Sequence, residues 1–245
     1  MGQYVGLDVS LEVTTVHVLD EQGKRVWRGT CVSHPTAIEA TIRKHAPDAE
    51  IVVVDSSKDR TPEIAEQAGA RVIRQFPPQG YGKAMEIALR SGTGDVVITL
   101  DCDNTYPASQ IPVLAKMVLE DGWDLVDASR LKSKPEAMPW ANYIGNKLFA
   151  VIASIIFRRH LTDLHSGMRA YRKRMIDELD FLAKGAALPV ELLLLPIKLG
   201  YKVTTHFIEY YDRLGVSTMN PYDTCKWTAW RIWRVWKSKQ MRKTA

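Results

Sequence analysis

The sequence has few cysteines, no long apolar run and no leader-like start. Its three cysteines among 245 residues, Cys31, Cys102 and Cys225, form no C-x-x-C pair, so neither a disulfide framework nor a zinc site is expected. This cysteine usage favours a reducing compartment, and we expect a cytoplasmic protein. The opening residues, MGQYVGLDVS, lack the basic and apolar regions of a secretory signal. No stretch reaches the roughly 18 uninterrupted apolar residues of a membrane-spanning helix, and the nearest, residues 148–157, is followed by two arginines.

Internal repeats and low-complexity linkers are also missing from the sequence. The composition, with 46% hydrophobic and 25% charged residues, is typical of a globular protein. The length indicates one large domain or one domain with appendages. The formal net charge of +5 fits an anionic partner such as nucleic acid, a nucleotide or a lipid headgroup, and does not choose among them.

Three zones follow one another along the chain. Residues 1–46 predict a β-meander and then a helix, because short alternating strands joined by turn residues precede a segment with helical spacing. Residues 47–220 are expected to form one domain. From about residue 50 to residue 130 apolar strands alternate with helices, which predicts an α/β fold with a mainly parallel sheet. Residues 140–215 of this domain are expected to be mostly helical, with one final strand. Residues 221–245 form a basic tail that is rich in tryptophan.

A pair of aspartates ends one apolar strand in the segment VVITLDCDNTYP, residues 96–107. The side chains of Asp101 and Asp103 leave the same face of an extended chain, because they are two residues apart. Two carboxylates this close repel each other unless a cation lies beside them. Mg2+ and Mn2+ prefer such oxygen ligands and keep positions open for phosphate. The pair therefore predicts a site for a divalent cation and a diphosphate, with two solvated carboxylates in a turn as the alternative.

Two other loops carry candidate ligand-binding residues. Asp55 ends the apolar run EIVVVD, where an acceptor can bind a nucleobase or a ribose. Asp59 follows in the loop and either contacts the ligand or caps the next helix. Gly82 and Lys83 open the helix in GYGKAMEIAL, which suggests a backbone that approaches a phosphate although the P-loop spacing is absent. A plain turn into the helix is the alternative for this segment.

Taken together, eight segments resemble the inverting family 2 glycosyltransferases, in particular their dolichol-phosphate mannosyltransferase-like branch. They occur in the family's order over about residues 50–220 and read EIVVVDSSKDRT, GYGKAMEIAL, GDVVITLDCDNTYP, DLVDASR, PWANYIGNKLF, LTDLHSGMRAYRK, PVELLLLPIKLGYKV and DRLGVSTM. The resemblance implies a Rossmann-like, GT-A type fold that binds a nucleotide sugar. It also implies metal-dependent transfer of a hexose, with inversion, from a nucleoside diphosphate sugar of the GDP-mannose or UDP-glucose class to a polyprenyl phosphate.

The resemblance further implies roles for single residues. Asp101 and Asp103 would hold Mg2+ or Mn2+ against the diphosphate, and Asp163 and Glu191 would complete the catalytic set, with Glu191 facing the sugar hydroxyls. Substrate-binding roles would fall on Asp55, Asp59, Gly82, Lys83, Arg130, Ser166, Arg169, Arg213 and Ser217. In this set Asp55 would contact the nucleoside, and Arg130 would pair with phosphate. The alternatives are a structural ion pair between Arg169 and Asp163 and a helix cap by Glu191.

Two features depart from the family's pattern. The usual first strand and its Pro-x-x-Asn-Glu-like loop, which helps to bind the base, are missing. In their place YVGLDVSLEVTTVHVLDEQGKRVW resembles the start of DEDD-type insertion-sequence transposases, in which Asp8 would be the first metal ligand. The later acidic motifs of that family are absent. Asp8 is therefore expected to lack the other metal ligands of that family and to belong to a fused transposase fragment. Thr218 stands where the branch usually has a lysine, which removes one expected phosphate contact.

The tail combines aromatic and basic side chains. Trp227, Trp230, Trp233 and Trp236 are three residues apart, and residues 226–243 contain seven basic residues and no acidic one. Tryptophan prefers the membrane interface, and lysine and arginine attract anionic headgroups. We therefore expect a helix on the inner face of the membrane, while docking on the domain and nucleic-acid binding are alternatives. Residues 142–157 would either add a second lipid contact or belong to the core.

The sequence thus predicts a membrane-associated glycosyltransferase that uses a divalent cation, a nucleoside diphosphate sugar and a lipid acceptor, with nucleic acid not expected as a partner. The alternatives are an inactive truncated glycosyltransferase fused to a transposase fragment and a transposase-derived nucleic-acid-binding protein.

Overall fold

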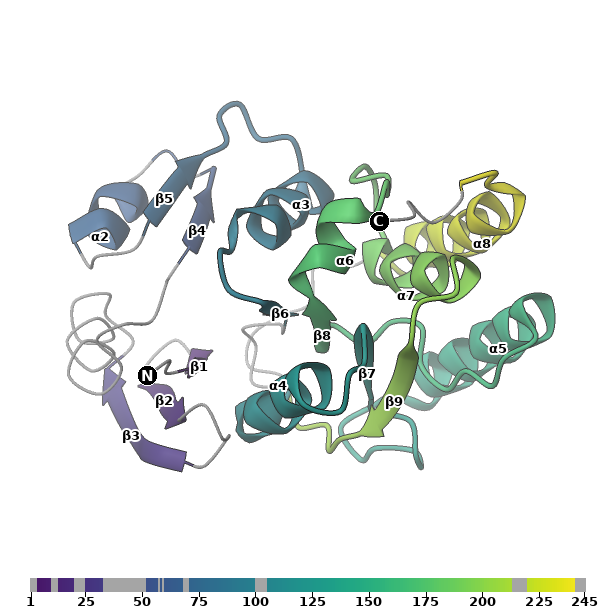
Figure 1. Ribbon diagram of the computed structural model, residues 1–245, viewed down its shortest axis with the longest axis horizontal. Helices are drawn as coiled ribbons and strands as arrows, with labels where there is room; N and C mark the ends of the chain where they lie inside the picture. The colour runs from purple at the N-terminus through teal and green to yellow at the C-terminus, as the bar shows by residue number, and fades with distance from the viewer. Residues whose placement is uncertain are drawn as a thin grey trace.

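A computed structural model describes most of the chain (Figure 1). The residues that it describes are 4–9, 13–19, 25–32, 52–56, 58, 60–67, 71–99, 105–212 and 220–240, and before residue 52 it describes the backbone alone. The helix predicted at the end of residues 1–46 lies outside these ranges.

The N-terminal segment contains the predicted β-meander. Its strands are β1 (Tyr4–Val9), β2 (Val13–Leu19) and β3 (Arg25–Val32). β2 pairs antiparallel with both of its neighbours, as alternating strands joined by short turns are expected to do. β1 also lies against the short 3-10 helix η1 (Ala108–Gln110), so the meander contacts the rest of the protein there.

A small parallel unit follows. β4 (Val52–Asp55) and β5 (Arg71–Arg74) pair in parallel, and α2 (Thr61–Gln67) connects them. A parallel pair requires such a crossover, and a helix usually provides it. α3 (Tyr81–Ser91) comes next and packs on β4.

The central sheet has four strands in the order β6-β8-β7-β9, which are Val96–Thr99, Arg169–Arg172, Leu125–Ser129 and Val203–Phe207. β7 and β9 are parallel, but β8 runs antiparallel to both β6 and β7. The prediction of a mainly parallel sheet is therefore wrong for this sheet, which is mixed. The cause is β8, a strand of four residues, RAYR, which is too short for a periodic pattern and lies in a region predicted to be mostly helical.

The two faces of the central sheet support two separate cores. Leu125 and Tyr171 point into a large core under α7 (Leu188–Lys198), while Val126 and Ala170 point into a smaller core under α4 (Ile111–Leu119). Adjacent strand residues face opposite sides of a sheet, so the two helices cover opposite faces. Figure 1 shows α7 grouped with α5 (Trp140–Phe157) and α8 (Pro221–Lys237), while α6 (Lys173–Glu178) lies next to β8.

α5 is the only described helix that is long and apolar enough to cross a membrane by length and composition. It has 18 residues, a mean hydropathy of 1.3 and only 11% of its residues buried. The sequence of α5 contains no uninterrupted apolar run of this length, because Asn142, Asn146 and Lys147 lie within the helix.

α8 shows that the tryptophan-rich tail is helical. Asn220 caps its start by accepting hydrogen bonds from the backbone N–H groups of Tyr222 and Asp223, at 3.0 and 3.5 Å, and Pro221 occupies the first turn. This is a typical beginning of an α-helix. α8 packs on α7 and α5, so the tail is docked on the domain.

Candidate active site

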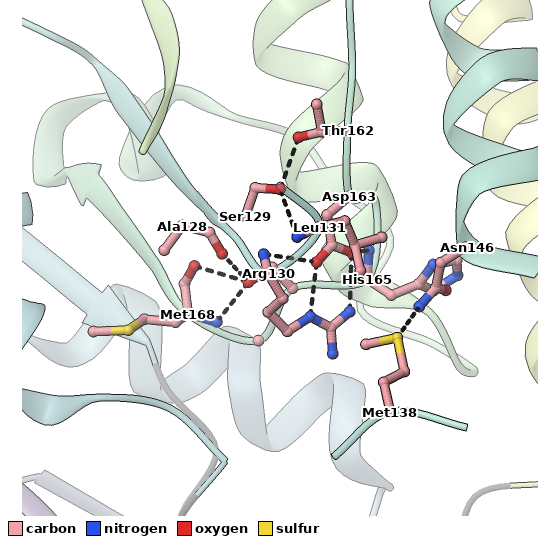
Figure 2. A network of polar contacts seen from close by, with 12 residues as sticks. Ala128, Ser129, Arg130, Leu131, Met138, Asn146, Thr162, Asp163, His165 and Met168 are labelled. Carbon is pink, nitrogen blue, oxygen red and sulfur yellow. Dashed lines mark hydrogen bonds and ion pairs between the residues drawn. The ribbon is translucent and has the colours of Figure 1, made fainter. Parts of the chain in front are cut away.

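Arg130 and Asp163 form a buried ion pair at the carboxyl end of β7 (Figure 2). The guanidinium donates from Nε to Oδ2 at 2.7 Å and from Nη2 to Oδ1 at 2.9 Å. The backbone N–H groups of Arg130 and His165 donate to the same carboxylate, at 3.3 and 3.0 Å. Burial raises the pKa of Asp163, but the charge and hydrogen bonds of Arg130 outweigh it and lower the pKa to about 2. Asp163 is therefore an ionised anchor for Arg130 and a poor proton acceptor.

One nitrogen of the Arg130 guanidinium, Nη1, has no acceptor among the described residues, although the side chain is only 8% exposed. Its carbon lies 5.9 Å from the ring centroid of Tyr106 and 5.1 Å from that of Tyr210, and the two rings pack edge to face at 5.8 Å. Among the described residues none accepts a hydrogen bond from Nη1, and Figure 2 shows this nitrogen pointing away from Asp163. An arginine that is fixed on one edge and open on the other is suited to bind a phosphate oxygen.

Thr99 and Tyr106 both bind the loop that carries Asp163. Thr99, the last residue of β6, donates from Oγ1 to the carbonyl oxygen of Gly167 at 2.9 Å. The hydroxyl of Tyr106 accepts the N–H of Gly167 at 2.7 Å. Gly167 belongs to the same loop as Asp163, so both ends of the segment that contains the aspartate pair are held beside that loop.

Tyr210 and Tyr211, which follow β9, also lie beside this ion pair. The N–H of Tyr211 donates to the carbonyl oxygen of Thr105 at 3.1 Å, and the neighbouring Tyr210 stacks on the guanidinium of Arg130. Three segments that are far apart in the sequence thus meet at Arg130. Five predicted site residues, Asp59, Asp101, Asp103, Arg213 and Ser217, lie outside the described residues, and their roles stay predictions.

Arg169 forms a second buried ion pair, with Asp127 of β7. Its Nε donates to Asp127 Oδ1 at 2.6 Å, its Nη2 to the carbonyl oxygen of Leu164 at 3.1 Å, and its Nη1 to that of Pro189. Burial raises the pKa of Asp127 to about 6, although the charge of Arg169 opposes this shift. Arg169 thus forms a structural ion pair, but its partner is Asp127 and not Asp163, the partner that the alternative named. All three nitrogens are bound within the protein, so this arrangement leaves none for a substrate.

Ser166 closes the turn of the loop that carries Asp163. Its hydroxyl donates to the carbonyl oxygen of Ala128 at 2.5 Å and accepts the N–H of Met168 at 3.3 Å. The residue is fully buried. In the structure Ser166 holds the loop of Asp163 against β7. Its predicted contact with the sugar or the acceptor stays a prediction.

His165 connects this loop with the C-terminal helix. Its Nε2 lies 2.7 Å from Thr228 Oγ1 of α8, and its ring lies 6.0 Å from that of Phe149 of α5. The buried Nδ1 has no hydrogen-bond partner among the described residues. Burial lowers the pKa of His165 to about 4, so the ring is neutral near pH 7.

Glu191 lies under α8 and is fully buried. Its carboxylate accepts hydrogen bonds from the guanidinium groups of Arg231 and Arg234 and, at 3.0 Å, from the backbone N–H of Leu182. Glu191 therefore does not cap its own helix; it joins α7 to α8 and to the loop before α7. Its predicted contact with the sugar stays a prediction, and this arrangement gives it a structural role.

Arg231 completes this connection. Its Nε and Nη2 donate to the carbonyl oxygens of Ala186 and Lys184 at 2.8 and 2.9 Å, and its Nη1 donates to that of Leu182 at 3.1 Å. Gly185 lies in the same turn, where an added Cβ would come within 2.2 Å of the Trp227 ring. The tail is thus docked through buried polar bonds and one tryptophan.

The other predicted contacts lie at the first two strand ends. Asp55 is buried and forms an ion pair with Arg74 across the β4–β5 pair. Gly82 is packed so that an added Cβ would lie 2.6 Å from the Ala183 carbonyl oxygen. The backbone that Gly82 approaches closely is therefore that of the protein's own residue Ala183. The Lys83 amine is bound to Glu86 at 2.6 Å. The nucleoside and phosphate contacts of these residues stay predictions.

A pocket of about 420 Å3 opens at the carboxyl end of β9, next to the segment that follows the aspartate pair. It is lined by Pro107, Ser109, Gln110, His206, Phe207, Ile208, Glu209 and Tyr211. Its volume lies in the range of small-ligand sites. Within the described part of the chain no three His, Cys, Asp or Glu side chains cluster as a metal site would require. That Asp101 and Asp103 hold Mg2+ or Mn2+ stays a prediction.

Several site residues were not predicted from the sequence. Asp127 lies in DLVDASR, and its position in a buried strand could have marked it as a paired carboxylate. Tyr106 and Tyr210 have no local signal that separates them from core tyrosines. Arg231 was read as one of the basic residues of the tail, because only contact with Glu191 distinguishes it.

Comparisons with known proteins agree with this geometry. The profile of the family described as Glycosyl transferase family 2 matches residues 35–180. A dolichyl-phosphate hexose transferase of Haloferax volcanii is 41% identical over 174 residues, which cover 71% of this chain and 75% of that protein. The low-salt glycan biosynthesis hexosyltransferase Agl6 of the same organism is 31% identical over 71% of this chain and 42% of its own length.

Solved structures show the same fold. Glucosyl-3-phosphoglycerate synthase from Mycobacterium tuberculosis, in complex with Mn2+ and uridine diphosphate, matches with a TM-score of 0.59 and 22% identity over 84% of this chain and 76% of that one. Mannosyl-3-phosphoglycerate synthase from Rubrobacter xylanophilus matches with a TM-score of 0.60 and 19% identity, covering 86% and 74% of the two chains. The mixed α/β architecture is therefore that of GT-A glycosyltransferases.

The transposase resemblance of residues 1–46 finds no support in these comparisons, and the family match begins at residue 35, inside that segment. The family match covers more than half of the chain, and the dolichyl-phosphate hexose transferase is 41% identical over 75% of its own length. The chain therefore belongs to glycosyl transferase family 2 and is a glycosyltransferase.

Proposed function

We propose that the protein transfers a hexose from a nucleoside diphosphate sugar to a polyprenyl phosphate such as dolichyl phosphate. The name of the Haloferax volcanii relative supports the acceptor class. UDP-glucose in a complex of the related synthase supports the donor class. The observation that carries the proposal is Arg130, which Asp163 holds on one edge, which Tyr106 and Tyr210 flank, and whose Nη1 has no acceptor among the described residues.

The chain's own residues account for the binding of the anionic groups. Arg130 is rigid because Asp163 binds it bidentately and two tyrosine rings flank it, so little side-chain entropy is lost when phosphate binds. An acceptor phosphate is already anionic and needs no strong general base. The low pKa of Asp163 agrees with this, because that carboxylate positions Arg130 and takes up no proton near pH 7.

A divalent cation completes the proposed site. Asp101 and Asp103 would hold Mg2+ or Mn2+, and the bound cation would neutralise charge on the nucleoside diphosphate as it leaves. The complex of the related synthase with Mn2+ supports this choice of cation.

We further propose that the enzyme works at the inner face of the membrane, held there in part by α8. Trp233 and Trp236 are exposed on this helix, and tryptophan and basic residues together favour the membrane interface. A lipid acceptor requires such a location, because its phosphate lies at the bilayer surface.

Transfer of labelled hexose to a polyprenyl phosphate in the presence of Mn2+ tests the function, with GDP-mannose and UDP-glucose as donors. Asp101→Asn should abolish transfer, because it removes a ligand of the cation. Asp121→Asn is the matched control, since Asp121 is exposed at the end of α4, and it should transfer at the wild-type rate. Equal inertness of the wild type and Asp101→Asn with both donors would overturn the proposal and support an inactive relative.

A further inference from the structure

α5 exposes one continuous apolar stripe to solvent. Trp140, Ile144, Leu148, Val151 and Ile155 are 65, 60, 58, 54 and 73% exposed. Their spacing of three or four residues places them along one face of the helix. Large contiguous apolar surfaces are uncommon on proteins that have no partner there, and they mark contact sites.

The opposite face of α5 belongs to the protein core. Ala150 and Ala153 are fully buried, and Phe149 and Phe157 pack against the same core. α5 also contacts α7 and α8. A helix that is docked along one face cannot be surrounded by lipid, so its apolar stripe suits the surface of a bilayer and not a span across it.

α8 continues this surface. Figure 1 shows α5 and α8 on the same side of the molecule, and the two helices are in contact. Trp233 and Trp236 are 55 and 53% exposed. The ion pair of Arg231 with Glu191 fixes the rotation of α8 about its axis, so these two rings are held on its outer side.

The charges around the apolar stripe indicate which kind of surface would bind it. Residues 131–160 contain five basic residues, Lys132, Lys134, Lys147, Arg158 and Arg159, and one acidic residue. Arginines follow the C-terminal end of α5, and lysines precede its N-terminal end. This pattern complements an anionic lipid surface. A second copy of the chain would bring like charges together, because a two-fold interface pairs identical faces.

The stripe is also connected to the candidate site. Lys147 of α5 donates from Nζ to the carbonyl oxygen of Leu131 at 2.8 Å. Leu131 directly follows Arg130, so the helix that carries the stripe also holds the backbone next to the open guanidinium. A bilayer against α5 would therefore lie close to the group expected to bind an anionic acceptor.

We propose that the outward faces of α5 and α8 together form a lipid-binding surface, with α5 as its main element lying along an anionic bilayer. This deepens the proposed function and rests on it for the identity of the acceptor, while binding to lipid can be measured without any acceptor.

Flotation of the full-length protein with phosphatidylcholine vesicles, with and without phosphatidylglycerol, tests the surface. We expect Leu148→Ser/Ile155→Ser to weaken binding to the anionic vesicles by roughly 100-fold, since each large side chain contributes about tenfold when buried and the two factors multiply. Val113→Ser/Leu119→Ser is the matched control, because these residues are exposed apolar side chains of α4 at 41 and 37%. Both variants should keep the wild-type melting temperature, because the changed side chains are solvent-exposed.

Three results would overturn the inference. The first is unchanged flotation of the α5 variant. The second is protein that remains on vesicles after alkaline carbonate extraction, which would indicate a spanning helix. The third is a wild-type dimer that the α5 substitutions convert to a monomer without affecting flotation.

Activity separates this inference from the proposed function. The α5 variant should lose transfer to a long-chain acceptor in vesicles but keep transfer to a short, water-soluble prenyl phosphate within about twofold of the wild type. If the wild type floats with vesicles and the α5 variant does not, the lipid surface is supported even where no hexose transfer to any acceptor is seen, and the proposed function fails alone. Equal loss of transfer to both acceptors would overturn the assigned role of the surface.

Discussion

Arg130 and Arg231 are both buried arginines that pair with a carboxylate, but their surroundings differ. Arg231 uses all three guanidinium nitrogens, on Glu191 and on three carbonyl oxygens of the loop before α7. Arg130 uses two nitrogens on Asp163, and within the described residues its third has no acceptor. Arg169 resembles Arg231, since Asp127 and two carbonyl oxygens bind its three nitrogens.

This difference distinguishes an arginine with a structural role, Arg231, from one that can bind a ligand, Arg130. A buried guanidinium that is fully bonded within the protein has nothing left to offer a substrate, and removing its partner mainly costs stability. A guanidinium that is bonded on one edge is oriented and still able to bind an anion. Two of the motif segments named Arg130 and Arg169 as candidates, and the number of guanidinium nitrogens bound within the protein distinguishes the two residues.

The largest expected effect concerns the region under α8. Glu191→Ala would leave Arg231 buried without its carboxylate, so the free energy of unfolding should fall by about 3–5 kcal/mol. Urea unfolding measures this change. Glu120→Ala is the control, because Glu120 pairs with Lys116 at 3.5 Å on the surface, where a pair contributes less than about 1 kcal/mol. Equal losses for the two variants would show that the buried contacts of Glu191 do not hold α8.

An intermediate effect is expected at the open arginine. Arg130→Lys removes the planar fork that binds Asp163 and an anion together, so kcat/KM for hexose transfer should fall by about 100-fold. Arg231→Lys should reduce stability while leaving kcat/KM per folded molecule within about twofold of the wild type. Steady-state kinetics on samples with a known folded fraction measure both. If the two variants lost the same activity per folded molecule, the distinction between the two arginines would be wrong.

The smallest effect concerns His165, which links the two regions through Asp163 and Thr228. Its pKa is lowered by burial from 6.5 to about 4, so the unfolded chain binds more protons between these values. The stability that the neutral ring contributes is present above pH 6.5 and is lost as the pH falls towards 4. His165→Gln cannot titrate, and we expect the stability difference between wild type and variant to fall by about 2 kcal/mol across this window. Parallel stability profiles in urea unfolding at several pH values would contradict this.

Local patterns predicted the parts of the fold that depend on neighbours in the sequence. The apolar runs of β4 and β6, the alternating strands of the N-terminal meander and the helix in the tail are all present. β8 was missed because four residues with an arginine at each end show no strand period. The mixed direction of the central sheet follows from that strand, so it could not be predicted without it.

The candidate site was predicted as a set of residues but not as an arrangement. The motif segments named Arg130, Asp163 and Arg169, while the structural pairing expected for Arg169 was with the wrong aspartate. The tail was expected on the membrane or docked on the domain, and it is docked through Arg231 and Glu191 while two of its tryptophans remain exposed.

The amino-acid order was sufficient for the family, the alternation of strands and helices, and the residue types gathered at the strand ends, because each of these rests on short segments. The tertiary structure determines which carboxylate each buried arginine pairs with. Arg130 and Asp163 are 33 residues apart, Arg169 and Asp127 are 42 apart, and Arg231 and Glu191 are 40 apart. Pairing over such distances depends on how sheets and helices pack, and that packing also leaves one face of α5 bare.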